Sequence, residues 1–162
     1  METIDDLLAA YEFESLATAG YHLALHVGFA FPKYQRNTLP PEWVEIYTKD
    51  GLMIFDPIIR WIYDNLGCTR WSAISDGDER KVLVAAASFG LHYGAAVSVM
   101  CDDAPGIRSF GSFTRSDREF DDAELELLGN EVKELHQAFI PERPLTQAEI
   151  DVLEMLASGL QL

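Results

Sequence analysis

Hydrophobic and polar residues follow two different periods along this chain, and each change of period marks a new element. Apolar residues three or four positions apart, the spacing of one helical face, predict helices over residues 3–19, 42–49, 56–66, 78–89 and 121–139. A shorter period predicts strands over residues 21–29, 93–101 and 107–114, with a short strand or loop over 32–41. Helices at both ends of an antiparallel sheet predict a layered α+β domain.

Local signals sharpen several of these boundaries. Asp56 before Pro57 is a good N-cap followed by a residue suited to the first helical turn. Asp121 and Glu124 have the spacing of a capping box at the start of the long helix. The first strand is predicted to present one apolar face, which consists of Tyr21, Leu23, Leu25, Val27 and Phe29.

Composition and charge narrow the possible functions. The 162 residues suit about one domain, and the formal net charge of −15 argues against binding to nucleic acid or to anionic membranes. No apolar run reaches the ~20 residues of a membrane span, and the acidic first residues do not resemble a signal peptide, so we expect a cytoplasmic protein. Cys68 and Cys101 are expected to be reduced, partly buried thiols.

The last part of the chain predicts the start of a second domain. Pro141 and Pro144 interrupt the helical pattern and indicate a linker. Thr146 and Glu149 then form a second capping box before another apolar helical stripe. One helix cannot bury its own apolar face, so the domain that begins here is cut off at residue 162.

The segment between Trp43 and Trp71 carries the most informative chemistry. Trp43 and Tyr47 lie one helical turn apart and offer an N–H, a hydroxyl and two aromatic rings. Asp56 lies at the start of the next helix, where an ionised carboxylate that only accepts hydrogen bonds is favoured. These residues suit a ligand with a carbonyl, an amide N–H and an apolar remainder. They equally suit a simple N-cap beside core aromatics.

This spacing, including the Asp-Pro pair, resembles the autoinducer-binding domain of LuxR-type quorum-sensing regulators. Residues 145–159 resemble the opening of that family's helix-turn-helix DNA-binding domain. The resemblance implies a signal-binding domain over 1–140, a linker over 141–145 and a truncated helix-turn-helix domain over 146–162. It also implies an α/β/α sandwich, in which a central antiparallel sheet is flanked by helices.

The resemblance implies a ligand and a role for each residue. The family binds N-acyl-homoserine lactones in a buried pocket. Trp43 would donate its indole N–H to the lactone carbonyl, and Asp56 would accept the amide N–H of the ligand. Tyr47 and Trp71 would pack against the lactone ring, and Ser112 would approach the oxygens of the acyl group. The walls around the acyl chain would come from the strand over 21–29 and from Leu52, Ile59, Phe89 and Val97.

The sequence departs from the family pattern at two positions. Leu39 stands where many members carry a tyrosine four residues before Trp43, and Ser109 stands where a glycine is frequent. Losing one buried hydrogen bond costs about 0.5–1.5 kcal/mol, at most roughly tenfold in affinity. The pocket could survive that loss, or the ligand could carry a different acyl group or be something other than an acyl lactone.

The resemblance also implies partners. The helix over 121–139 would pair two copies into a homodimer, and DNA would be bound only through the C-terminal domain, most of which this chain lacks. The chain is then a fragment or a naturally short protein. A short protein could instead form inactive mixed dimers with a full-length regulator and act as an anti-activator.

Catalysis and metal binding have little support in the sequence. His22 and His26 lie on a predicted strand, about 13 Å apart, too far to share an ion. No nucleophile elbow and no phosphate-binding loop occur. We therefore expect a non-enzyme without metal or cofactor. A small hydrolase using Asp56 or a histidine is a remote alternative.

Overall fold

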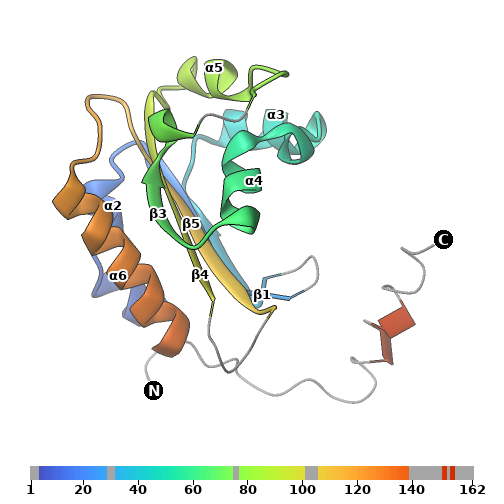
Figure 1. Cartoon of the computed structure of the whole chain (residues 1–162), viewed down its shortest axis with the longest axis vertical. Coiled ribbons are helices and arrows are strands. Elements are labelled where there is room, and N and C mark those ends of the chain that lie inside the picture. The colour runs from blue at the N-terminus through green and yellow to red at the C-terminus, as the bar shows by residue number, and fades with distance from the viewer. Residues whose placement is uncertain are drawn as a thin grey trace.

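A computed structural model describes residues 4–28, 32–74, 77–100, 106–138, 151–152 and 154–155. Within these ranges the chain forms one open antiparallel sheet in the order β2-β1-β5-β4-β3 (Figure 1). The strands are β1 (Gly20–Val27), β2 (Tyr34–Asn37), β3 (Gly67–Arg70), β4 (Tyr93–Met100) and β5 (Arg108–Arg115). The sheet is central and flanked by helices, which confirms the predicted α+β sandwich.

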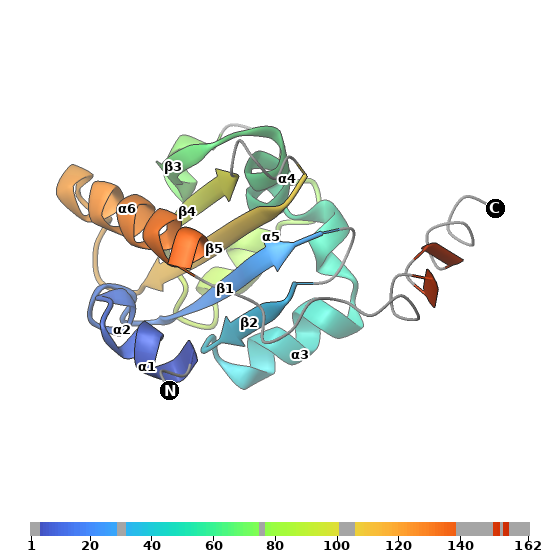
Figure 2. The same cartoon turned by 90° about the horizontal axis from the view of Figure 1, so that it is seen from below.

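Helices cover both faces of the sheet (Figures 1 and 2). One face carries the long helix α6 (Asp122–Ala138) together with the short helices α1 (Ile4–Ala9) and α2 (Phe13–Leu16). The other face carries α3 (Pro41–Lys49), α4 (Pro57–Asp64) and α5 (Val82–Ala87), with two 3-10 turns, η1 (Leu52–Phe55) and η2 (Trp71–Ala73). Since successive strand residues point to opposite faces, every strand contributes to two separate cores.

The core beneath α6 is closely filled. Phe13, Tyr21 and Phe113 form an aromatic cluster with ring centroids 5.3 to 5.7 Å apart. Each such buried ring stabilises the fold by about 1.5–3 kcal/mol relative to an exposed one. The cluster continues into the apolar stripe of α6 through Leu23, Leu25, Val97, Leu125, Leu128, Val132 and Leu135.

The core on the other face is divided into two smaller clusters. One joins α4 to the sheet through Ile58, Ile62 and Phe110. The other surrounds Trp43 and Val82 in the helical layer. Residues of the central strands that face this side are small or polar, namely His22, Ala24, Gly94, Ala96, Ser98 and Ser112. This face therefore has room that the α6 face lacks.

A β-bulge in β1 corrects the predicted apolar face of this strand. The register with β5 shifts between Ala24 and Val27, and His26 adopts a left-handed backbone with φ of 51°. The extra residue moves Val27 to the side of Ile58 and Phe110, while Tyr21, Leu23 and Leu25 stay beneath α6 as predicted. Phe29 lies outside the described residues.

The single helix predicted over 3–19 is wrong, because the chain turns between α1 and α2. The turn brings Phe13 into the core, where it is 1% exposed. The N–H of Glu12, at the start of α2, donates to both carboxylate oxygens of Glu131 at 3.2 Å. A contact 119 residues away along the chain thus interrupts a locally helical pattern.

Several other boundaries also differ from the prediction. Strand β3 was not predicted, because it is a short edge strand whose first two residues are exposed. Helix α5 begins later than expected, at Val82, because the Asp78 carboxylate accepts the N–H groups of Val82 and Leu83 at 2.8 and 2.9 Å. Helix α4 ends at Asp64, where Arg108 donates to the carbonyls of Ile62 and Asn65 at 2.8 and 3.1 Å.

The capping signals, in contrast, were predicted well. Asp56 accepts the N–H of Ile58 at 2.8 Å at the start of α4. Asp121 and Glu124 cap each other's N–H groups at 2.8 and 3.0 Å, as a capping box requires. The predicted linker over 141–145 lies outside the described residues, and residues 151–152 and 154–155 are helical. In the described ranges, no helix has the length and apolarity that a membrane span needs.

Candidate functional site

A cavity of about 100 Å³ lies between the sheet and the layer of α3, α4 and α5. Its walls are mainly apolar, with a few polar groups from the helices and from the sheet. Most residues expected to contact a ligand line it: Leu39, Trp43, Tyr47, Asp56, Ile59, Trp71 and Ser112.

Asp56 is the best-ordered polar group of the cavity. It is 8% exposed, and its two carboxylate oxygens accept hydrogen bonds from the Tyr47 hydroxyl at 2.7 Å and from the Ile58 N–H at 2.8 Å. Burial raises the pKa of Asp56, and these two hydrogen bonds oppose that rise. Burial and the neighbouring carboxylate raise the pKa of Tyr47, so this hydroxyl stays a donor. The carboxylate is therefore held in one orientation with lone pairs left to accept another N–H.

Trp43 forms the opposite wall. It lies on α3, one turn before Tyr47, and the two ring centroids are 5.7 Å apart. Phe89 packs behind Trp43 at 5.7 Å and does not itself line the cavity. Trp43 is 4% exposed, so its ring position is set by packing on two sides. A rigid aromatic wall facing a fixed carboxylate suits an amphiphile with a polar head.

Trp71 occupies the end of the cavity nearest β4, at the start of η2. Its indole lies directly on Gly94, where an added Cβ would be 2.0 Å from Trp71 Cδ2. The neighbours of Trp71 hold it from outside, since Arg70 donates to the Phe120 carbonyl at 2.6 Å and Ser72 donates to Glu119 at 2.5 Å. Among the described residues, the buried Nε1–H of Trp71 has no hydrogen-bond partner.

Gly94 is thus a cavity-shaping residue that the sequence analysis missed. A glycine inside a strand pattern is itself a signal for close approach of another group. His22 was missed as well, because it was considered only as a metal ligand. It lines the cavity from β1 directly beside Ser112, its partner on β5.

Three residues expected at the ligand do not line the cavity. Val97 lies beneath α6, because the cavity-facing residues of β4 are its neighbours Ala96 and Ser98. Leu52 packs in the cluster around Trp43 without reaching the cavity, and Phe89 lies behind the same ring. The apolar residues of β1 likewise face α6, so its contribution to the wall comes from His22.

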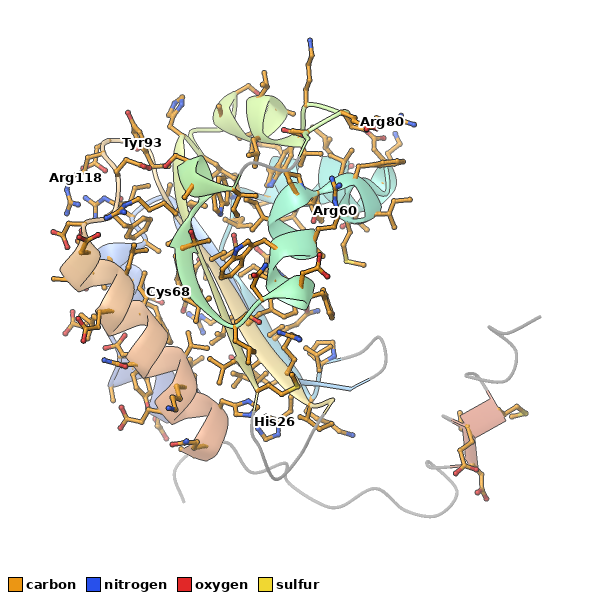
Figure 3. The ribbon with its side chains drawn as sticks, viewed as in Figure 1. His26, Arg60, Cys68, Arg80, Tyr93 and Arg118 are labelled. Atoms are coloured by element: carbon orange, nitrogen blue, oxygen red, sulfur yellow. The ribbon has the colours of Figure 1, made fainter. Side chains whose placement is uncertain are left out.

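Histidines and cysteines outside the cavity form no catalytic or metal centre in the described part of the chain. There, no three side chains of the types His, Cys, Asp and Glu gather around a possible ion. The His26 side chain lies at the end of the sheet, where its Nε2 contacts the carbonyl of His136 at 2.8 Å (Figure 3). Cys68 is exposed on β3, not partly buried as expected, and Cys101 lies outside the described residues.

A mainly apolar cavity with a few convergent polar groups, enclosed by a two-faced α+β sandwich, defines a small-molecule binding domain. Residues 1–139 match the family model of the autoinducer binding domain. The chain therefore belongs to this family, the autoinducer-binding domain of LuxR-type regulators, which bind small-molecule signals and are regulators, not enzymes.

Solved structures share the same fold. SdiA of Escherichia coli is 23% identical, with a TM-score of 0.64 over 98% of this chain and 74% of that chain. SdiA in complex with octanoyl-rac-glycerol is 24% identical, with a TM-score of 0.62 over 98% of this chain and 72% of that chain. CepR2 from Burkholderia cenocepacia, an N-acylhomoserine lactone dependent LuxR family transcription factor, is 21% identical, with a TM-score of 0.58 over 79% of this chain and 75% of that chain. No curated protein matches this sequence.

Proposed function

We propose that this domain binds an N-acyl-homoserine lactone in the cavity beneath α3, α4 and α5. The observation that carries the proposal is the fixed Asp56 carboxylate, which Tyr47 and the Ile58 N–H orient at the edge of an otherwise apolar cavity. A buried carboxylate is costly unless its remaining lone pairs are used. An amide N–H of a ligand supplies the missing donor.

The family resemblance assigns the other contacts. Trp43 donates its indole N–H to the lactone carbonyl from the wall facing Asp56. Tyr47 and Trp71 pack against the lactone ring, and Ser112 approaches the acyl oxygens. Leu39 and Ile59 border the apolar part of the ligand, since both line the cavity.

Binding enlarges the cavity in this proposal. A volume of about 100 Å³ is below the roughly 300 Å³ at which pockets for drug-sized ligands begin. Met53 lines the cavity from η1, a turn without any buried residue, so this segment can move at low cost. A ligand that binds only the folded state stabilises it by about 2.7 kcal/mol at a concentration of 100 times Kd.

The output of binding follows the family in the same proposal. Ligand-stabilised domains pair through α6 into a homodimer, and the domain predicted to begin at residue 146 then contacts DNA. The linker over 141–145 and this second domain remain predictions, as does the cytoplasmic location. Mixed dimers with a full-length regulator are the alternative output.

A second ligand class is favoured by one comparison. The complex of SdiA with octanoyl-rac-glycerol has this fold and an acyl ligand without a lactone ring. An acylglycerol offers no amide N–H to Asp56, but its hydroxyls can donate to the same carboxylate. Both ligand classes therefore belong in the test.

The test is a thermal-shift series with acyl-homoserine lactones of graded chain length and with octanoyl-rac-glycerol. We expect Tm to rise most at one chain length, and Trp43→Phe and Asp56→Asn to abolish the rise. Trp61→Phe and Asp64→Asn are matched controls, because neither residue lines the cavity and both should retain the full shift. A flat response across the lactones, with wild type well folded alone, would contradict lactone binding. A shift with octanoyl-rac-glycerol alone would assign the second ligand class.

A further inference from the structure

A row of side chains crosses the sheet beneath the cavity. Asn37 on β2 pairs with His22 on β1, His22 pairs with Ser112 on β5, and Ser112 pairs with Ala96 on β4. Paired residues of neighbouring strands point to the same face, with Cβ atoms about 4.5–5.5 Å apart. His22 and Ser112 both line the cavity. The floor of an otherwise apolar cavity thus carries two adjacent polar groups.

The hydrogen bond of His22 determines what its ring can offer. Its Nε2 lies 3.1 Å from Gln35 Oε1, and an amide oxygen only accepts, so Nε2 carries the proton. Burial lowers the pKa of His22, which keeps the ring neutral near pH 7. The other ring nitrogen, Nδ1, is therefore an acceptor. No group among the described residues donates to it.

Ser112 is complementary to this acceptor. Its hydroxyl makes no hydrogen bond with any described residue and can both donate and accept. Phe110 lies on the same face of β5, with its ring edge-on to His22 at 6.0 Å, and adds apolar surface beside the pair. Polar groups next to apolar surface lose free energy when a ligand covers them without hydrogen bonding. A ligand that fills this cavity must then match one free acceptor and one free hydroxyl.

We propose that His22 and Ser112 form a subsite for a hydroxyl group on the acyl chain of the ligand. A hydroxyl donates to His22 Nδ1 and accepts from the Ser112 hydroxyl at the same time. A keto oxygen only accepts, so it uses Ser112 and leaves His22 unpaired. An unsubstituted methylene uses neither. The inference rests on the proposed function and narrows its ligand class to hydroxyacyl amides, with His22 as the residue that determines specificity.

The experiment compares three lactones at the chain length that gives the largest thermal shift: unsubstituted, 3-oxo and 3-hydroxy. Isothermal titration calorimetry supplies Kd for each. We expect the 3-hydroxy ligand to bind wild type about tenfold more tightly than the unsubstituted one, the effect of one to two net hydrogen bonds. The 3-oxo ligand should bind more weakly than the 3-hydroxy ligand.

Variants separate the subsite from general packing. His22→Leu keeps a similar volume without the acceptor, so the preference for the hydroxyl should fall to about twofold or less. His22→Asn places an amide oxygen close to the position of Nδ1 and should restore most of it. Ser112→Ala should reduce the preference while leaving His22 intact. His92→Asn changes an exposed histidine outside the cavity and should change nothing.

The outcomes are distinguishable. If no acyl lactone of any kind binds, the proposed function fails and the subsite fails with it. If all three lactones bind wild type equally, or the 3-oxo ligand binds most tightly, lactone binding stands and the hydroxyl subsite is wrong. A preference that persists in His22→Leu and Ser112→Ala also overturns it. Should His22→Leu fail to fold, His22→Asn and Ser112→Ala decide the question.

Discussion

The contact between Gly94 and Trp71 gives a sharp prediction for a single methyl group. Gly94→Ala would place a Cβ 2.0 Å from Trp71 Cδ2 and 2.1 Å from Cε2. Ordinary contact begins at 3.4 Å, so the indole must retreat by at least 1.4 Å. It can only retreat away from the sheet, toward the helical layer and the cavity. The backbone of Gly94 is not in the left-handed region, so strain there plays no part.

The expected effect has two parts. Overpacking of this kind costs about 1–3 kcal/mol of the free energy of unfolding. Displacement of the Trp71 ring changes the cavity wall, and we expect acyl-lactone affinity to fall about tenfold, equivalent to about 1.4 kcal/mol. Urea unfolding measures the first part and calorimetric titration measures the second.

Gly129→Ala is the matched control for this substitution. It lies in α6, and its added Cβ would be 3.6 Å from Cys68 Sγ, an ordinary contact. Alanine is about 1 kcal/mol more favourable than glycine inside a helix, so this variant should gain stability and bind ligand as wild type does. Wild-type stability and affinity in Gly94→Ala would refute the close contact between Trp71 and the sheet.

Three further predictions concern charged groups. Arg108→Met removes the donors to the last carbonyls of α4 and should lower the free energy of unfolding by about 2–3 kcal/mol in urea; a loss under about 0.5 kcal/mol would contradict the capping role. Burial raises the pKa of Asp56, so lactone affinity measured by calorimetry should fall as pH drops through that value, above the ordinary 3.8. In the unliganded protein the same raised pKa means that the contribution of Asp56 to stability is lost as pH rises through it. The Arg118 guanidinium lowers the pKa of Glu124 from 4.5 to about 2, so the stabilisation is present above pH 4.5 and is lost toward pH 2. Glu124→Gln should remove that part of the acid-induced fall in Tm, and an unchanged acid profile would contradict it.

Elements with local signals were predictable from the sequence. The proline and aspartate before α4 and the capping box before α6 specify those helix starts from residues within one turn. The same locality explains why Trp43, Tyr47 and Asp56 were predicted together, since α3 and α4 follow each other closely in the chain. Short spacing in sequence became short distance in space, 2.7 Å between the Tyr47 hydroxyl and Asp56.

Features that depend on distant contacts were not predictable. The periodicity of β1 shows which residues share a face, but not which face the cavity occupies. His22 was therefore overlooked, and Val97 was placed at the ligand by mistake. The bulge at His26 is held by His136, 110 residues away, and by the Ser109 hydroxyl, which accepts the His26 N–H at 3.0 Å. No local pattern reports such a contact.

The alternation of the central strands has a consequence for how ligand preference can change. Residues that shape the cavity, such as His22, Ala96 and Ser112, are interleaved one by one with residues that hold α6, such as Leu23 and Phe113. A substitution at a cavity-facing position leaves the packing under α6 untouched, because the side chains lie on opposite sides of the sheet. Selectivity for a signal can therefore diverge rapidly between related chains, while the scaffold that carries α6 stays the same.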